Sequence, residues 1–301
     1  MGMTDQITVF DRKLLRTRRN RAAGDIGAFD FLLQDVAGKL MERLEVVKKE
    51  FPLVLDLGGH GVMAEKLKGR AGTETVVSSD ISMPMAAQAP LPVVADEEFL
   101  PFKTASLDAV ISNLALHWVN DLPGALIQIR NALKPDGMFL AALLGGESLR
   151  ELRDALMTAE LAVAGGASPR VSPFIDMRDM GSLLQRAGFA LPVVDSDIIT
   201  VDYPNALKLM HDLRGMGASN AVHSRLMKPT RSAVIMEAAR LYQEKYANDE
   251  GRIPATFQIV YAIGWAPHAS QQQPLRPGTA KVKLADALEA TEISAGEKAK
   301  P

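Results

Sequence analysis

The apolar residues of this chain follow two patterns that alternate along its length. Between residues 28 and 50, apolar positions recur every three or four residues, which predicts an amphipathic helix. Downstream, short apolar runs of strand length are separated by further stretches of helical spacing. The predicted strands span residues 53–57, 75–80, 92–95, 107–112, 138–144, 191–201 and 256–265. This alternation predicts an α/β fold with a mostly parallel sheet that carries helices on both faces.

Helix and turn signals divide the chain into regions. Helical spacing is found at residues 63–68, 122–133, 147–163, 177–187, 206–213 and 232–246. The composition of residues 134–137 predicts a turn before the fifth strand. The last two helices fall between the last two strands, so residues 205–250 are expected to form a helical insertion or lid. We therefore predict an N-terminal helical segment (1–50), a sheet domain (51–267) and a mobile tail (268–301).

Composition narrows the classes of function. The chain has 301 residues, of which 47% are apolar, and a formal charge of −2, so nothing in its charge favours nucleic acid. It contains no cysteine, which excludes disulfides, thiolate nucleophiles and Cys-ligated zinc. No stretch approaches the roughly 20 apolar residues that span a membrane, and the N-terminus lacks an apolar signal core. We expect a cytoplasmic protein that is not inserted in a membrane.

A basic cluster lies near the N-terminus. Its members are Arg12, Lys13, Arg16, Arg18, Arg19 and Arg21. We expect a solvated helix face here; contact with a ligand or a partner is the alternative.

A glycine-rich loop, Asp56-Leu57-Gly58-Gly59-His60-Gly61, joins the first predicted strand to a helix. From Gly59 onward it also satisfies the dinucleotide pattern G-x-G-x-x-A. Asp56 separates the two interpretations, because an acid would repel a pyrophosphate but suits the ammonium and sulfonium charges of S-adenosylmethionine. Asp80, at the end of the second strand, is placed to accept hydrogen bonds from ribose hydroxyls. The alternative is that both acids only form turns at strand ends.

The ends of the third and fourth strands hold the remaining candidates. Asp96 and Glu97 could bind an adenine amino group or begin a solvated turn. Asn113 and Leu114 end the fourth strand, at the edge where open parallel sheets bind their ligands. His117 follows as a candidate general base or substrate-orienting group, or as a histidine packed beside a tryptophan. The histidines lack metal-ligand spacing, so we predict no metal.

With these residues in view, the chain resembles class I methyltransferases in residues 54–61, 77–81, 94–102, 107–118 and 133–139. Further segments of the sequence are similar to the methyltransferase-type assembly factors of respiratory complex I. They include Val9-Phe10-Asp11-Arg12 and Leu116-His117-Trp118-Val119-Asn120-Asp121-Leu122-Pro123. A more distant likeness is to the malonyl-carrier-protein methyltransferases of biotin synthesis. The resemblance implies a Rossmann-like, seven-stranded sheet with its last strand antiparallel, and S-adenosylmethionine as cofactor. The predicted cofactor site comprises Asp56, Gly58, Gly59, His60, Gly61, Asp80, Ile81, Asp96, Glu97, Asn113 and Leu114.

The resemblance also implies a protein substrate. Mitochondrial members are linked to hydroxylation of an arginine side chain, and the bacterial partner would be the equivalent subunit of the NADH:quinone oxidoreductase, met in the cytoplasm or peripherally at the inner membrane. Three functions stay open: arginine modification by methyl transfer or hydroxylation, O-methylation of a small molecule or acyl carrier, and assembly chaperoning without catalysis. One departure bears on all three. His60 and Val62 stand where the usual loop D-x-G-x-G-x-G has glycines.

Overall fold

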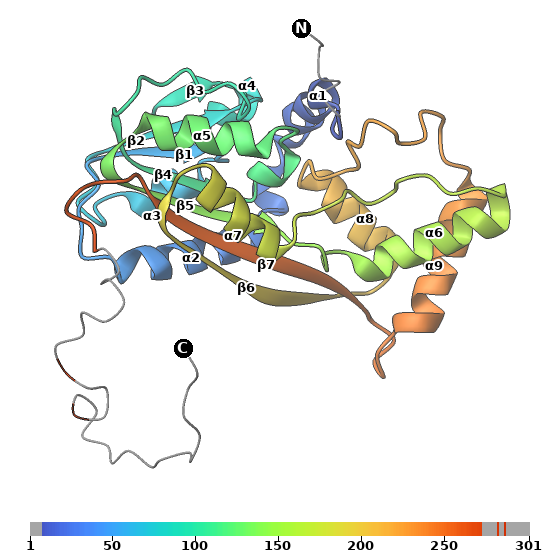
Figure 1. Ribbon diagram of the computed structural model, residues 1–301. Coiled ribbons are helices and arrows are strands. Elements are labelled where there is room, and N and C mark those ends of the chain that lie inside the picture. The colour runs from blue at the N-terminus through green and yellow to red at the C-terminus, as the bar shows by residue number, and fades with distance from the viewer. Residues whose placement is uncertain (1–7, 273–281, 283–285, 287–301) are drawn as a thin grey trace, which may run out of the picture. The chain divides into compact units, whose positions relative to one another are not determined.

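One mixed sheet organises the chain. The computed structural model describes residues 8–272 together with residues 282 and 286. Within them, seven strands lie in the order β3-β2-β1-β4-β5-β7-β6 (Figure 1). Their bounds are β1 Leu53–Leu57, β2 Thr75–Asp80, β3 Pro92–Val94, β4 Leu107–Asn113, β5 Leu133–Leu144, β6 Ala190–Tyr203 and β7 Ile253–Trp265. The strands β3, β2, β1, β4 and β5 pair in parallel, and β7 is antiparallel to both of its neighbours. The predicted fold class is confirmed.

Helices cover both faces of this sheet (Figure 1). Their bounds are α1 Arg12–Ala22, α2 Phe31–Glu45, α3 Val62–Leu67, α4 Met83–Ala86, α5 Leu122–Ala132, α6 Arg150–Ala164, α7 Met177–Arg186, α8 Ala206–Gly215 and α9 Ser232–Tyr246, with two short 3-10 helices, Ile26–Ala28 and Leu116–Trp118. One hydrophobic core joins the sheet to α2, α3, α6, α8 and α9, and a second joins its other face to α5 and α7. The carboxyl ends of the parallel strands are therefore flanked by both layers.

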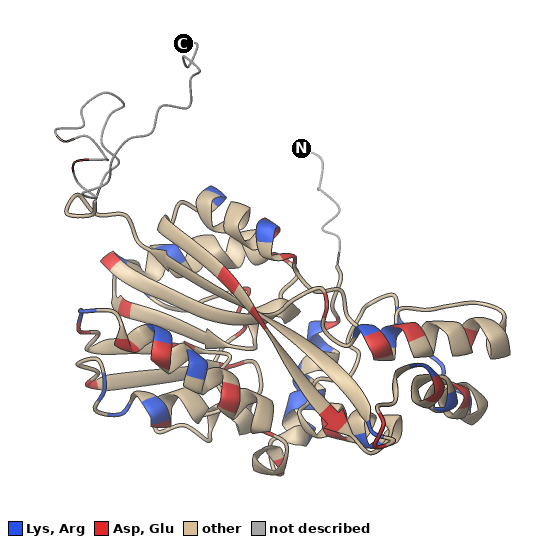
Figure 2. Ribbon diagram, turned by 90° about the horizontal axis from the view of Figure 1, so that it is seen from below, with Lys and Arg blue, Asp and Glu red and all other residues tan. Residues whose placement is uncertain are grey.

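The central strands are buried because helices cover both of their faces. In β4, every residue except Asp108 is buried. Figure 2 shows that the strands carry few charged residues: their ribbons are mostly tan, whereas basic and acidic positions lie mainly on helices and loops. Continuous apolar runs are what a parallel sheet with two covered faces requires.

Two details differ from the sequence expectations. Residues 134–137 do not form a turn, because they lie inside β5. In the ladder between β4 and β5, Leu107 pairs with Leu133 and the next pair is Ala109 with Met138. The four residues of β5 between these pairs, 134–137, therefore form a bulge, which explains why their composition resembles that of a turn. Helix α2 ends at Glu45, five residues before the periodic pattern does.

The helices α8 and α9 lie between β6 and β7 in sequence, inside the range 205–250 predicted as an insertion. Most of the tail predicted from residue 268 onward falls outside the described residues. In the described part of the chain, no helix is long and apolar enough to cross a membrane.

Candidate active site

Asp56 lies beneath the glycine-rich loop, at the end of β1. Its side chain is fully buried, and its Oδ2 accepts a hydrogen bond from the Ser78 hydroxyl at 3.1 Å. Its Oδ1 has no hydrogen-bond partner among the described residues. Burial raises the pKa of Asp56 to about 7; the Ser78 hydrogen bond opposes this rise, and the nearby Asp80 carboxylate adds to it. A buried acceptor atom without a partner suits a cationic ligand group.

The loop glycines are required by close approach and by backbone conformation. A Cβ on Gly59 would lie 1.9 Å from Oδ2 of Asp56. Gly58 has a φ of +69°, and a Cβ there would lie 2.2 Å from the Cβ of Ala115. Gly61 has a φ of +79° and forms the N-cap of α3.

The same geometry explains the departure from the usual glycine pattern. The positive φ angles fall at Gly58 and Gly61, whereas Val62 is already the first residue of α3. The displaced glycine therefore stands where this backbone needs it. His60 between them is buried, so it contributes its side chain to the interior of the site.

The acids predicted to bind a nucleoside are held by arginines of α1. Asp80 is fully buried, and its Oδ2 lies 2.6 Å from Nη1 of Arg19. Arg19 also lies 3.4 Å from Oε1 of Glu97. Arg12 binds Glu97 and, at 2.5 Å, Oδ1 of Asp96. Helix α1 thus covers the predicted nucleoside end of the site.

This finding corrects the expectation of a solvated basic face. Arg12, Leu15, Arg19 and Ala22 recur at intervals of three and four residues, and Leu15, Arg19 and Ala22 are buried. Lys13, like Arg16 and Arg21, remains exposed. Sequence reasoning missed Arg12 and Arg19 as site residues, although their shared helix face with Leu15 was a signal that could have identified them.

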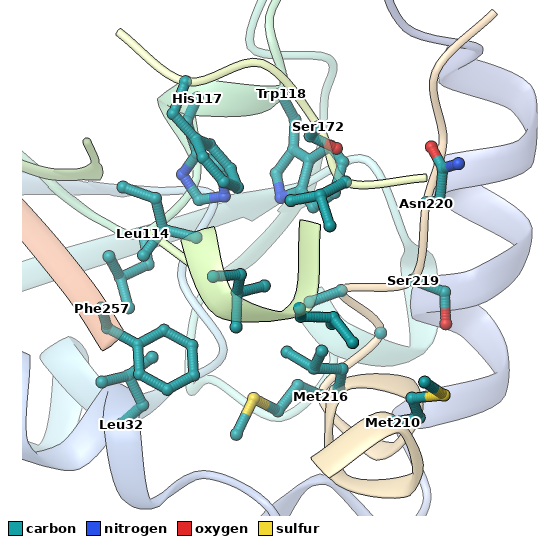
Figure 3. Close-up of a pocket in the computed structure, with 18 of the residues that line it drawn as sticks. Leu32, Leu114, His117, Trp118, Ser172, Met210, Met216, Ser219, Asn220 and Phe257 are labelled. Carbon is teal, nitrogen blue, oxygen red and sulfur yellow. The ribbon is translucent and has the colours of Figure 1, made fainter. Parts of the chain in front are cut away.

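A cavity of about 220 Å³ opens beside the loop, at the carboxyl ends of the strands. Three predicted residues line it, namely His60, Leu114 and His117. Its other walls come mainly from apolar side chains of α2, α6 and α8, with Arg19 and Arg170 as its charged members. Figure 3 shows Leu114, His117 and Phe257 on one side of the cavity, and Met210, Ser219 and Asn220 on the other.

The two histidines of the cavity are neutral. Burial, together with the smaller effect of the positive charge of Arg19, lowers the pKa of both His60 and His117 to about 3. The ring of His117 packs against Trp118 and Phe174, at centroid distances of 5.2 and 5.8 Å. Its Nδ1 is buried and has no partner among the described residues. The packing expected for a structural histidine is thus present, but one ring nitrogen stays available to a ligand.

Arg170 is a second wall residue that sequence reasoning missed. Its Nε lies 3.2 Å from Oε2 of Glu160, and its Nη1 donates to the Thr230 hydroxyl at 2.7 Å. The remaining predicted residues do not line the cavity. Ile81 is buried next to Asp80, and Asn113 donates its Nδ2 to the Leu33 carbonyl at 2.9 Å.

The residues present fit S-adenosylmethionine at one end of the site. Two buried acceptor atoms without partners lie at the ends of β1 and β4, on the same face of the sheet, namely Asp56 Oδ1 and Asn113 Oδ1. Acceptors of this kind suit an ammonium group. At the nucleoside end, Asp80 and Glu97 have guanidinium partners that a ribose would have to replace or share. Within the described residues, no group of three His, Cys, Asp or Glu side chains could hold a metal.

Comparison with known proteins identifies the family of this chain. Residues 55–141, which carry the loop and β4, match the family model described as a methyltransferase domain. The mitochondrial arginine hydroxylase NDUFAF5 of Danio rerio is 43% identical over 288 residues, which cover 93% of the chain and 89% of that protein. The chain belongs to the S-adenosylmethionine-dependent methyltransferase superfamily. Its sequence relatives are named for two chemistries, arginine hydroxylation and O-methylation, and S-adenosylmethionine is the cofactor of this chain.

Two further comparisons show how far this methyltransferase-family chain resembles other proteins in sequence and in fold. The malonyl-[acyl-carrier protein] O-methyltransferase of Methylovorus sp. (strain MP688) is 35% identical over 283 residues, covering 89% of the chain and 93% of that protein. Among solved structures, a putative methyltransferase from Bacillus halodurans C-125 has a TM-score of 0.54 at 16% identity, covering 77% of the chain and 99% of that structure. The solved structure supports the fold alone, whereas the two sequence relatives support the family.

Proposed function

We propose that this chain is an S-adenosylmethionine-dependent enzyme that modifies an arginine side chain on a subunit of the NADH:quinone oxidoreductase, in the bacterial cytoplasm or at the inner membrane surface. The observation that carries the proposal is the 43% identity with an arginine hydroxylase over 93% of the chain. The apolar part of the cavity wall supports it, because apolar side chains beside the loop suit the aliphatic stem of a long side chain.

In this proposal the chain holds its cofactor through the loop and the strand ends. Asp56 would pair with the ammonium group through its free Oδ1, and the loop from Gly58 to Gly61 would let the backbone approach the ligand closely. Asp80 would hold the ribose and would then share its carboxylate with Arg19 or exchange one for the other. The bound cofactor supplies a sulfonium centre and its electrophilic methyl group.

His117 has the role of a hydrogen-bonding group that positions the substrate. A base whose pKa is about 3 accepts a proton poorly at neutral pH, so general-base catalysis by this residue is disfavoured. Its free Nδ1 can still accept a hydrogen bond from a substrate N–H. The geometry thus favours orientation of the guanidinium over its deprotonation.

The chemistry at the arginine has two possible outcomes with different requirements. Methyl transfer needs only the cofactor's methyl group and the loss of one substrate proton. Hydroxylation of a carbon needs an oxygen atom and a two-electron oxidation, which dioxygen together with a reductant would provide. The products differ in mass, since one gains a methylene and the other gains an oxygen atom.

Mass spectrometry of the oxidoreductase subunits tests the proposal. Subunits are compared from a wild-type strain, a strain lacking the gene, and the latter complemented with the Gly59→Ala variant. We expect one arginine-containing peptide to lose the mass of a methylene or of an oxygen atom in the deletion strain and in the variant. Unchanged masses in all strains would contradict the proposal, and restored assembly without restored mass would indicate a chaperone.

A second candidate function is O-methylation of an acidic acyl group on a carrier protein. The observation that favours it is the charge of the cavity wall, which contains Arg19 and Arg170 and, among the described residues, no carboxylate. Guanidinium groups suit an anionic substrate. Transfer of label from methyl-labelled S-adenosylmethionine to a malonyl carrier protein would support this candidate, and absence of transfer would count against it.

A further inference from the structure

Two hollows outside the cavity share residues with its wall. The larger, of about 430 Å³, includes Arg18, Arg225 and Lys228, and it shares Arg170 and Asn220 with the cavity. The smaller, of about 310 Å³, is lined by Arg18, Arg21, Arg214 and Ser219, and it shares Ser219 with the cavity. We call Arg18, Arg21, Arg214, Arg225 and Lys228 the basic rim. The basic rim therefore lines hollows that adjoin the wall of the proposed substrate site.

The positive charge of the basic rim is largely unbalanced. Arg225 pairs with Asp11 at 3.3 Å. Arg21, Arg214 and Lys228 are exposed, and among the described residues they form no ion pair. No Asp or Glu of the described chain lines either hollow. Surface cations that lack internal partners are available to an external anion.

The positive charges of the basic rim repel one another at Arg18. Its guanidinium donates to the Asn220 carbonyl, which places it between the two hollows. Burial lowers the pKa of Arg18, and the positive charges of Arg225 and Arg21 lower it further. Bringing a negatively charged group into the rim would relieve this repulsion.

Apolar side chains accompany these cations. Leu226 and Met227 line the larger hollow and are 41% and 75% exposed, in the sequence directly before Lys228. Together, these apolar side chains and the unpaired cations offer a partner both apolar and charged contacts. The surface is hollowed and continuous with a cavity of side-chain size, which favours an inserted polypeptide segment over a flat bilayer.

We propose that the basic rim binds an acidic segment of the protein substrate that adjoins the modified residue. The segment places carboxylates against Arg18, Arg21, Arg214 and Lys228, and an apolar side chain on Leu226 and Met227. This proposal rests on the proposed function, because it concerns a protein substrate of the same cavity. It adds that the enzyme selects its protein substrate by acidic residues near the modified arginine. The same charges also accelerate association of the substrate with the enzyme.

Binding of two synthetic peptides to the full chain tests the proposal. Both fluorescent peptides carry one central arginine and one apolar residue; their flanks are Asp and Glu in one, and Asn and Gln in the other. We expect the acidic peptide to bind at least about tenfold more tightly at low salt, and added salt to reduce this difference. Equal affinity for the two peptides would overturn the proposal.

Charge-reversal variants locate the binding surface. The rim variant combines Arg21→Glu, Arg214→Glu and Lys228→Glu, none of which lines the cavity. The matched control combines Lys68→Glu, Lys103→Glu and Arg186→Glu, which are exposed cations without ion pairs in the described chain, outside both hollows. We expect about a tenfold loss of acidic-peptide affinity in the rim variant alone. An equal loss in both variants would overturn the proposal.

Two more measurements separate this proposal from others. Calorimetry with S-adenosylmethionine checks that the rim variant keeps its fold and cofactor site. Sedimentation with phosphatidylglycerol vesicles tests a membrane partner; rim-dependent vesicle binding without acidic-peptide selectivity would overturn the proposal in favour of a lipid surface. Selective peptide binding together with unchanged subunit masses would support acidic docking while contradicting the proposed function.

Discussion

Replacement of Asp56 by Asn should stabilise the ligand-free protein at neutral pH. The Asp56 carboxyl is fully buried beneath the glycine-rich loop, and its pKa is raised to about 7, chiefly by burial. Between its ordinary value of 3.8 and about 7, the native state holds a proton that the unfolded chain releases. The free energy of unfolding therefore falls as pH rises through this window. Asn cannot ionise, so the variant avoids that loss.

The magnitude follows from the pKa. A shift of one unit corresponds to about 1.4 kcal/mol, so a shift to about 7 gives up to about 4 kcal/mol above pH 7. The Asn oxygen can still accept the hydrogen bond of the Ser78 hydroxyl. The stability gained by the variant should grow by about 3 kcal/mol from about pH 5 to about pH 8, since roughly two units of the window lie in that range.

Urea unfolding followed by circular dichroism at the two pH values measures this difference. Asp249→Asn is the matched control, because it makes the same substitution at an exposed position. The Asp56→Asn variant should also bind S-adenosylmethionine more weakly, since an amide does not pair with an ammonium group as a carboxylate does. A variant less stable than wild type at pH 8, or a stability difference independent of pH, would refute the reasoning.

Three further changes test other parts of the site. Gly59→Ala would place a methyl group 1.9 Å from Asp56 Oδ2, so we expect at least about a tenfold loss of S-adenosylmethionine affinity in calorimetry; unchanged affinity would contradict the close packing. Arg170→Met leaves the buried Glu160 without its cation, and urea unfolding should show a loss of about 3 kcal/mol rather than a negligible one. His117→Gln should lower turnover without moving the pH profile between about pH 6 and 9, because a histidine whose pKa is about 3 stays neutral there; a lost titration limb would show that His117 acts as a base.

The local parts of the site could be predicted from sequence. Around Asp56, a strand is followed within a few residues by a glycine-rich turn and a helix. Each of these elements is indicated by its own hydrophobic pattern or composition. The carboxyl ends of parallel strands lie on one edge, so Asp80 and Leu114 could be placed near the loop before the structure was known.

The contacts made by α1 could not be predicted in the same way. Arg19 meets Asp80 across 61 residues of sequence, and a basic side chain on a helix gives no local sign of its partner. The cluster as a whole is typical of a solvated face, and its exposed members are just that. Only the helix face that Arg12 and Arg19 share with Leu15 distinguished these two arginines from the exposed ones.

The residues that line the cavity could not be predicted from the sequence for a related reason. Met210 and Phe257 line the cavity together with residues from α2 and α6, although these segments lie far apart in the chain. Apolar side chains that face a cavity follow the same helical spacing as those that face a packed core. Their role depends on tertiary packing, which leaves no separate mark in the pattern.

Calorimetric titration of the purified chain with S-adenosylmethionine tests the central claim most directly, that the loop after β1 binds this cofactor. The account predicts saturable binding at one site per chain, weakened in the Gly59→Ala variant while circular dichroism shows an unchanged fold. Absence of binding by the wild-type chain, or equal affinity of the wild type and the variant, would contradict it.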